Sequence, residues 1–317
     1  MKLEILPVQG IGDVTAGDDL AELITKAAPW LADGDILVVT SKIVSKAEGR
    51  LVEVPADGPE REEARQRVLA GETARVVARR GPTTIVQTHH GFVMAAAGID
   101  ASNVDKTHLV LLPVDPDASA RSLRDKLLSQ NKDVAVIISD TMGRAWRNGL
   151  TDVALGAAGI EAIRDHRGEL DPYGNELVLT QMAVIDELSA AAELVKGKSD
   201  QVPVAVIRGY PGTGEGSGAK ELIRDTASDM FSLGTAEARA QGLRDAALLD
   251  ADDEATTQRA LDIVRTGALR LTPAGPSPAD FLRLGAETHR VRTMLAADGH
   301  RTTVVFDDAG ATIEVIK

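Results

Sequence analysis

The sequence predicts a fold in which strands and helices mix throughout, of the α/β or α+β class. Short apolar runs rich in β-branched residues, typical of buried strands, are interspersed with segments whose apolar residues recur at helical spacing. One such run, 134–140, ends abruptly in Asp140 and Thr141, and strand ends are where such proteins present polar side chains. The 317 residues, 44% of them hydrophobic, suffice for one large domain or two of ordinary size.

Each expected element follows from its local pattern. Six apolar runs are predicted as strands: 3–8, 35–40, 83–88, 108–114, 134–140 and 202–208. Helical periodicity predicts helices at 17–32, 58–80, 118–130, 180–197 and 218–232, and the alanine-rich segment 235–270 is also helical in pattern. The loop with Pro273, Pro276 and Pro278 is the best linker candidate. A helix at 279–297 and a hairpin with strands 302–306 and 311–316 are expected after it.

Composition excludes several classes of function. The net charge of −13 argues against general nucleic-acid binding through a basic surface. The absence of cysteine excludes disulfides, thiolate catalysis and cysteine-ligated metals. Residues 1–30 lack the pattern of a secretory signal, and the apolar stretches are too short to span a bilayer. We therefore expect a soluble cytoplasmic protein with no nucleic-acid or membrane partner.

The segment 134–152 carries the strongest chemical signal. Asp140 and Thr141 close the apolar run, and Arg144 and Arg147 follow around Trp146. A carboxylate and a hydroxyl with two guanidinium groups nearby suit a divalent cation that holds phosphates. An Asp–Thr helix cap followed by solvated arginines is the alternative interpretation.

A second carboxylate, Asp100, closes the segment GFVMAAAGID just before Ser102 and Asn103. Asp100 and Asn103 could reach a metal and a ligand hydroxyl or base, whereas an Asx-turn at a strand end is the structural alternative. Asp100 and Asp140 both follow apolar runs, and hard cations prefer carboxylate oxygens. This recurrence favours a metal site that they share.

The glycine-rich segment 209–224 follows one predicted strand and precedes a helical pattern, where backbone N–H groups can cradle phosphate. Gly214, Gly216 and Ala219 fit the dinucleotide fingerprint, but no strand with a terminal acid follows, and Lys220 does not belong to a Walker A sequence. The segment is therefore an anion loop of unassigned type or a flexible surface loop, and Glu215 within it is a metal ligand or simply solvated.

Two further turns follow strands. Segment 40–50 offers the hydroxyl of Ser41 and the positive charges of Lys42, Lys46 and Arg50. Lys42 and Lys46 would share one face of a helix, which is also the usual pattern of a solvated basic helix. The turn at 10–14 contains glycine and can offer backbone donors.

Taken together, these segments resemble the coenzyme F420:L-glutamate ligase family, the gamma-glutamyl ligases of deazaflavin biosynthesis. The matching blocks run from ILPVQGIGDV through TSKIVSKAEGR, AAAGIDASNV, LLPVDPDASA, ISDTMGRAWRNG, DPYGNEL and ELVKGK to the 209–224 loop. The sequences of these blocks most resemble the actinobacterial branch, whose ligase domain is often fused to a flavin-binding reductase domain. The resemblance covers 1–245, expected to be the ligase domain. The extension 246–317, of helices plus a hairpin and of unknown role, is too short for a fused reductase domain.

The resemblance implies an α+β fold of two parts with a mixed sheet, neither Rossmann nor ATP-grasp, and a homodimer. It implies that GTP binds at Ile11, Gly12, Asp13, Val14, Ser41, Lys46 and Asn103 and at the loop residues Gly212, Thr213, Gly214, Glu215, Gly216 and Ser217. It implies metal positions at Asp100, Asp140, Thr141 and Glu215 for two Mg²⁺ or Mn²⁺ ions, with K⁺ as a further candidate. Gly12 departs from the family, which commonly has proline there.

The implied reaction transfers the γ-phosphate of GTP to the terminal carboxylate of coenzyme F420-0, and the amine of L-glutamate then attacks the acyl phosphate. Further γ-linked glutamates would be added in later rounds. We hypothesise that Lys46, Arg144 and Arg147 are the catalytic residues that hold phosphates or carboxylates. Two alternatives stay open: a ligase of the same fold for another acid acceptor, and a non-catalytic sensor that binds GTP and metal.

Overall fold

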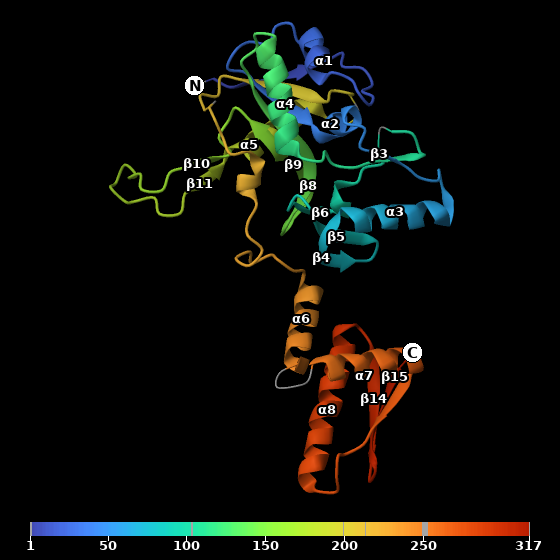
Figure 1. Ribbon diagram of the computed structural model, residues 1–317. Helices are drawn as coiled ribbons and strands as arrows, with labels where there is room; N and C mark the ends of the chain where they lie inside the picture. The colour runs from blue at the N-terminus through green and yellow to red at the C-terminus, as the bar shows by residue number, and fades with distance from the viewer. Residues whose placement is uncertain (1, 103, 199, 213, 249–252, 317) are drawn as a thin grey trace. The chain divides into compact units, whose positions relative to one another are not determined.

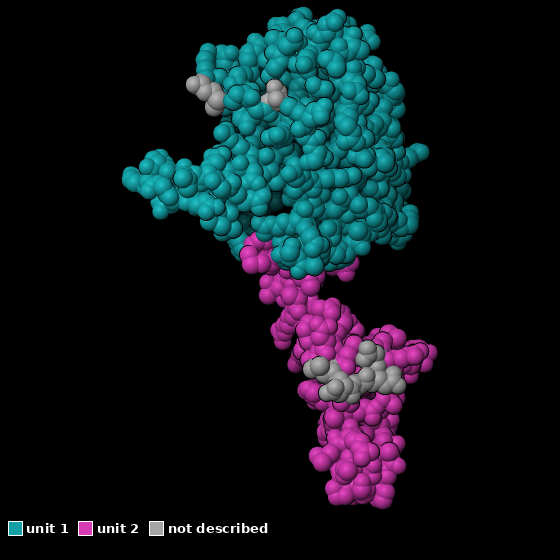
Figure 2. Space-filling view, turned by 60° about the vertical axis from the view of Figure 1, so that its left-hand side comes forward, with its two compact units in different colours: residues 1–76, 80–229 teal, residues 77–79, 230–317 magenta. Residues whose placement is uncertain are grey.

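The chain forms two compact units, which comprise residues 1–76 with 80–229 and residues 77–79 with 230–317 (Figure 2). The computed structural model describes residues 2–316 except 103, 199, 213 and 249–252. Among the described residues, no helix combines the length and the apolar character that a membrane span requires.

A five-stranded mixed sheet is the centre of the first unit. Its order is β1 (Glu4–Val8), β12 (Val204–Arg208), β2 (Ile36–Thr40), β8 (Ala135–Arg144) and β9 (Arg147–Ala158). Only β2 and β8 pair in parallel, and the other three pairings are antiparallel. The expected α+β class with a mixed sheet is confirmed.

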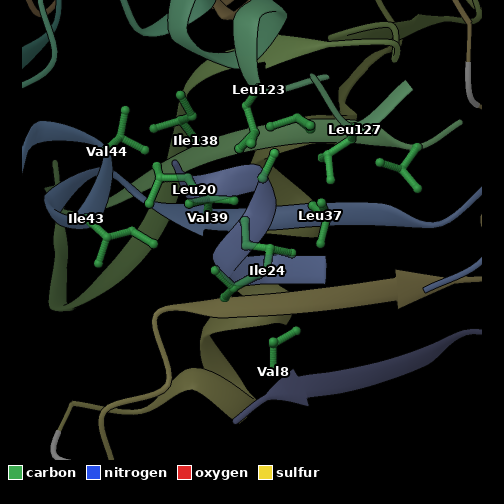
Figure 3. Close-up of a cluster of buried hydrophobic side chains, with 14 of the residues drawn as sticks. Val8, Leu20, Ile24, Leu37, Val39, Ile43, Val44, Leu123, Leu127 and Ile138 are labelled. Carbon is green, nitrogen blue, oxygen red and sulfur yellow. The ribbon is translucent and has the colours of Figure 1, made fainter. Parts of the chain in front are cut away.

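Helices cover both faces of this sheet because residues of each strand alternate between them. On one face, Leu37 and Val39 pack in a cluster with residues of α1 (Leu20–Ala27), α2 (Ser41–Ala47) and α4 (Pro116–Ser129), as Figure 3 shows. On the other face, Ile36 and Val38 pack with residues of α5 (Val184–Lys196). The strands read as continuous apolar runs because both of their faces are buried.

The pairing defines two edges of the sheet. Strands β1, β2 and β8 run in one direction, and β12 and β9 run against them. We call the edge where β1, β2 and β8 end the carboxyl edge, and the edge where they begin the amino edge. Residues that follow β1, β2 and β8 are therefore neighbours at the carboxyl edge.

Smaller elements surround the central sheet (Figure 1). They are the pair β3 (Leu51–Glu53) and β7 (His108–Val110), the sheet of β4 (Thr73–Arg80), β5 (Thr83–Thr88) and β6 (Val93–Ala95), the pair β10 (Ile163–Asp165) and β11 (Gln181–Ala183), the helix α3 (Gly58–Glu72), and the 3₁₀ turns η1 (Ala96–Gly98) and η2 (Ala219–Leu222).

The second unit has its own sheet and core. Its elements are α6 (Thr235–Leu248), α7 (Asp253–Thr266), β13 (Ala268–Leu271), α8 (Pro278–Ala297), β14 (Arg301–Asp307) and β15 (Gly310–Ile316). The strands order as β13-β15-β14, and Ile263, Val291, Leu295 and Ile313 are among the core residues. The loop with Pro273, Pro276 and Pro278 lies inside this unit, between β13 and α8, and residue 245 lies within α6.

All six expected strands and the C-terminal hairpin are confirmed, five of the strands with shifted ends. Several helix predictions are wrong in part: the start of the expected helix 180–197 forms β11, and the end of the helical segment 235–270 forms β13. The helix expected at 58–80 ends at Glu72, and 73–80 forms β4 in the sheet with β5 and β6. The helix expected at 218–232 is reduced to the single turn η2. Gly218 precedes that turn with φ +91°, and Ile223 after it packs against the cluster of Phe92 and Met94, so tertiary contacts override the helical pattern there.

Candidate active site

The carboxyl edge brings Ser41 and Asp140 together from two parallel strands. Thr40 at the end of β2 is in register with Ser139 of β8, so the residues that follow them are neighbours. Ser41, the first residue of α2, is buried, and its hydroxyl donates to Asp140 Oδ2 at 2.9 Å. The backbone N–H of Thr141 donates to the other carboxylate oxygen at 2.6 Å.

Asp100 also contacts the first turn of α2, through Lys42, the residue after Ser41. It follows the kinked turn η1, where Ala97 adopts φ +54°, and an antiparallel bridge to Val110 fixes its backbone. Its carboxylate accepts from the backbone N–H of Ser102 at 2.7 Å, so the Asx-turn alternative is correct as far as it goes. The same carboxylate also pairs with the Lys42 ammonium at 2.6 Å, which a simple turn does not require.

The two carboxylates differ in their proton affinity. Burial raises the pKa of Asp140 to about 6, although Ser41 and the N–H of Thr141 stabilise the ionised form, and the nearby charges of Asp152 and Asp100 raise the pKa further. Burial also raises the pKa of Asp100, but the ammonium of Lys42 and the N–H of Ser102 outweigh it and hold the pKa below its usual value. Asp100 is thus paired with an ammonium group, whereas the contacts described for Asp140 are those with the Ser41 hydroxyl and the N–H of Thr141.

Thr141 points to the opposite face from Asp140, as alternation along β8 requires. Its hydroxyl donates to Asp152 Oδ1 at 2.8 Å, across the pairing of β8 with β9, and accepts from the Lys198 ammonium at 2.6 Å. Asp152 and Lys196 are buried together behind it.

The turn at 11–14 and Lys46 lie near the carboxyl edge. Ile11 and Val14 are buried in the core that includes α1 and α2, whereas Gly12 and Asp13 are exposed after β1. Lys46 is half-buried in the last turn of α2. The remaining expected nucleotide contact, Asn103, lies outside the described residues.

Arg144 and Arg147 are placed away from the two carboxylates. They form the last pair of β8 with β9 and are exposed at the tip of this hairpin, beside Trp146, which is 85% exposed. Four residues of strand separate Asp140 from Arg144, which is about 13 Å at ~3.3 Å per residue. The two guanidinium groups therefore start from backbone positions several residues beyond Asp140 along the hairpin.

The glycine-rich loop lies at the amino edge. It follows β12, which runs against β2 and β8, and Gly214 N donates to Gly159 O beyond the end of β9 at 3.0 Å. Gly216 is close enough to the backbone that an added Cβ would lie 2.1 Å from Ile160 O. Gly212, Glu215 and Ser217 are exposed in this loop, and Thr213 lies outside the described residues.

The loop is anchored by a buried carboxylate, Asp117 in the first turn of α4. Its oxygens accept from the backbone N–H groups of Ala157 at 2.9 Å, Ala219 at 2.7 Å and Lys220 at 3.3 Å. Gly218 passes directly over it, because a Cβ there would lie 2.6 Å from the carboxylate. Residues 218–220, at the end of the glycine-rich segment, are therefore anchored to the first turn of α4.

The donor set at the carboxyl edge fits a hard divalent cation. Carboxylate and hydroxyl oxygens of Asp100, Asp140 and Thr141 are the ligand types that Mg²⁺ and Mn²⁺ prefer. The oxygens of Asp100 and Thr141 already accept ammonium groups, so positive charge is accommodated there. Among the described residues, no group of three or more acidic, histidine or cysteine side chains forms a metal site. The protein would thus supply part of a coordination shell that phosphates and water complete, as is usual for Mg²⁺.

Sequence reasoning missed Asp152, Lys196 and Lys198 as members of this site. One signal was available for Lys196. In α5 the buried residues Ile185, Leu188 and Ala192 recur at helical spacing, and Lys196 continues that face. A lysine on a buried face requires an anionic partner, which predicts a buried acid without saying which one.

Comparison with known proteins shows the family to which the chain belongs. A family model described as F420-0:Gamma-glutamyl ligase matches residues 10–209. The coenzyme F420:L-glutamate ligase of Methanothermobacter thermautotrophicus is 41% identical over 250 residues, which cover 73% of this chain and 99% of that protein. The enzymes of the same name from Archaeoglobus fulgidus and Methanopyrus kandleri are 39% and 40% identical, over 73% and 72% of this chain and 97% of each relative. The chain therefore belongs to the F420-0:gamma-glutamyl ligase family and is a ligase.

Proposed function

We propose that the chain joins L-glutamate to coenzyme F420-0 through an amide bond, with conversion of GTP to GDP and phosphate. The names of its relatives support the acceptor and the amino acid. The observation that carries the proposal is the convergence of Asp100 and Asp140 on the first turn of α2, where Ser41 and Lys42 contact them. Residues from three distant parts of the sequence thereby form one cation- and phosphate-binding edge.

The chemistry explains why such an edge is needed. A carboxylate does not form an amide directly, because oxide is a poor leaving group. In the proposed route an oxygen of the acceptor carboxylate bonds to the γ-phosphorus, and the bond to the β-phosphate oxygen breaks, releasing GDP. The amine of glutamate then bonds to the acyl carbon, phosphate leaves with the electron pair of the C–O bond, and the amine loses a proton to the medium. Every reactant is anionic, so charge neutralisation and alignment dominate the barrier.

Different residues at the carboxyl edge would bind the metal ions and the nucleotide. Asp100, Asp140 and Thr141 would hold two Mg²⁺ or Mn²⁺ ions, and K⁺ is a further candidate. When bound, these ions would neutralise phosphate charge. The turn at 11–14, Ser41 and Lys46 would bind the nucleotide, and Lys42 pairs with Asp100. Alignment of the two carboxylates by α2 sets where the triphosphate would lie.

We further propose a homodimer that works in the cytoplasm. The topology supports the dimer, because the glycine-rich loop and Asp140 lie at opposite edges of one sheet. Val136 of β8 pairs with Ala158, which lies next to the loop. Asp140 is four residues further along β8, so the distance between the backbones of Val136 and Asp140 is about 13 Å. A loop and a carboxyl edge that serve one nucleotide would therefore come from different copies, as would Arg144 and Arg147.

The proposal is tested with purified protein, GTP, Mn²⁺ or Mg²⁺, glutamate and F420-0. Mass spectrometry of the products should show the acceptor increased by one glutamyl residue, with one GDP released per amide bond formed. If glutamate is transferred only to another carboxylic acid in a panel of acceptors, that acid and not F420-0 is the substrate. GTP binding without GDP release under any of these conditions would identify a sensor and refute the ligase reaction.

A further inference from the structure

A buried ion pair lies directly behind the expected metal position at Thr141. The Lys196 ammonium, at the end of α5, donates to Asp152 Oδ2 at 2.9 Å and to the Ser139 hydroxyl at 2.9 Å. The side chains of Lys196 and Asp152 are 1% and 2% exposed. Ser139 completes a closed set, because its hydroxyl donates to Asp152 Oδ2 at 3.0 Å.

This ion pair controls the hydroxyl of Thr141. The second oxygen of Asp152, Oδ1, accepts the hydroxyl proton of Thr141 at 2.8 Å. With its hydrogen committed to Asp152, the Thr141 oxygen directs its lone pairs elsewhere, toward a cation. The Lys198 ammonium donates to this oxygen at 2.6 Å, and the side chain of Lys198 is 65% exposed.

Stability alone does not account for a pair of this kind. Burying an ammonium and a carboxylate costs solvation that their attraction only roughly repays, and apolar replacements of such pairs are often as stable. The pair here spans three elements that meet at the carboxyl edge: α5 through Lys196, β8 through Ser139 and Thr141, and β9 through Asp152. It therefore fixes the end of β8 at the point where Asp140 and Thr141 turn to opposite faces.

We propose that Asp152 and Lys196 are positioning residues, which act through Thr141 to shape the cation site at the carboxyl edge. Asp152 orients the hydroxyl of Thr141, and Lys196 holds the carboxylate of Asp152 in place. Lys198, on the exposed side, is a displaceable ammonium that leaves Thr141 when a metal cation binds. This inference rests on the proposed function, since it assumes that Thr141 contributes to a metal site.

The test measures Mn²⁺ affinity by electron paramagnetic resonance, with GTP present and no acceptor, so that turnover is not needed. The variants are Asp152→Asn, Lys196→Met and the double variant. We expect each single variant to bind Mn²⁺ about 10- to 100-fold more weakly, the usual effect of removing a group that orients a metal ligand. Lys198→Met should bind Mn²⁺ at least as tightly as the wild type, because the competing ammonium is gone.

The double variant separates positioning from stability. Each single variant removes the partner at 2.9 Å from a buried charge, leaving Lys196 only Glu193 at 3.6 Å or Asp152 only Lys198 at 3.9 Å. Each should therefore lower the unfolding temperature, whereas the double variant removes both buried charges. We expect the double variant to recover much of the thermal stability while its Mn²⁺ affinity stays low. Recovery of both, or unchanged affinity in a folded single variant, would overturn the inference.

Asp35→Asn is the matched control. Asp35 is also a buried carboxylate, 2% exposed, and it pairs with Arg208 at 2.6 Å, but it precedes β2 and so lies at the amino edge. It should lower thermal stability without weakening Mn²⁺ binding; equal weakening in the control would assign the effect to loss of an ion pair in general. If the wild type itself binds no Mn²⁺ in the presence of GTP, the proposed function fails instead.

Discussion

Ser41 donates its hydroxyl proton to Asp140 at 2.9 Å, although 99 residues separate the two in the sequence. The contact exists because β2 and β8 are the one parallel pair of the central sheet, in a register that matches Thr40 with Ser139. Through the next residue, Lys42, the same helical turn also holds Asp100. One turn of α2 thus sets the separation of the two carboxylates on which the proposed activity depends.

Asp140→Asn should remove most of the activity. The amide oxygen can accept from the N–H of Thr141 while the amide nitrogen donates to the Ser41 hydroxyl, so both contacts can be kept, but the negative charge that would attract a divalent cation is lost. We expect turnover to fall about 10²- to 10³-fold, on the scale of removing one preorganised electrostatic group. Steady-state GDP release with saturating Mn²⁺ is the measurement, and near-normal turnover would refute the metal assignment of Asp140.

The same substitution should change how stability depends on pH. The pKa of Asp140 is raised to about 6 in the folded protein, against about 3.9 in an unfolded chain. Between these values the folded state binds more protons, so the free energy of unfolding decreases as pH rises through this range and stays lower above it. In the absence of divalent cations, the difference in stability between Asp140→Asn and the wild type should therefore shift in favour of the variant between about pH 4 and pH 8, by on the order of 2 kcal/mol.

Urea unfolding at several pH values measures this shift. The comparison cancels the titrating groups that are distant from Asp140, whereas Asp100 and Asp152 interact with it and contribute to the measured shift. A difference between the two proteins that does not vary with pH would show that the carboxylate of Asp140 is not held in a desolvated environment.

Gly216→Ala should destabilise the first unit, and Gly214→Ala should not. A Cβ at Gly216 would lie 2.1 Å from Ile160 O, so backbone must move, whereas a Cβ at Gly214 meets no atom within 4 Å. We expect a loss of roughly 1–3 kcal/mol for Gly216→Ala and a neutral or slightly stabilising effect for Gly214→Ala. Urea unfolding of the two variants side by side is the measurement, and equal effects would show that the loop adopts a different path.

Arg147→Ala should lower catalytic efficiency without lowering the stability of the fold. Arg147 is exposed at the hairpin tip, so its removal should leave the free energy of unfolding within about 0.5 kcal/mol. If its guanidinium holds a phosphate or a carboxylate of the substrates, catalytic efficiency should fall at least tenfold, the loss expected of one charge-assisted contact. Unchanged efficiency in this variant and in Arg144→Ala would remove both residues from the catalytic set.

The periodicity of the sequence located most elements, and tertiary contacts decided the exceptions. The six apolar runs form strands because a run buried on both faces has few alternatives. Residues 73–80 carry a helical pattern yet form β4, since pairing with β5 satisfies their backbone in a way that local sequence does not encode.

The site shows the same division between sequence and structure. From the sequence alone, Asp100, Asp140 and Ser41 are seen to follow apolar runs, and the recurrence of the two carboxylates favours a metal site that they share. The folded structure was needed to see that these residues meet, that the glycine-rich loop lies at the other edge, and that Asp152 and Lys196 are buried behind Thr141. The physical reason is that strand direction and register place residues in space, and both depend on pairings between segments about a hundred residues apart, which no local pattern records.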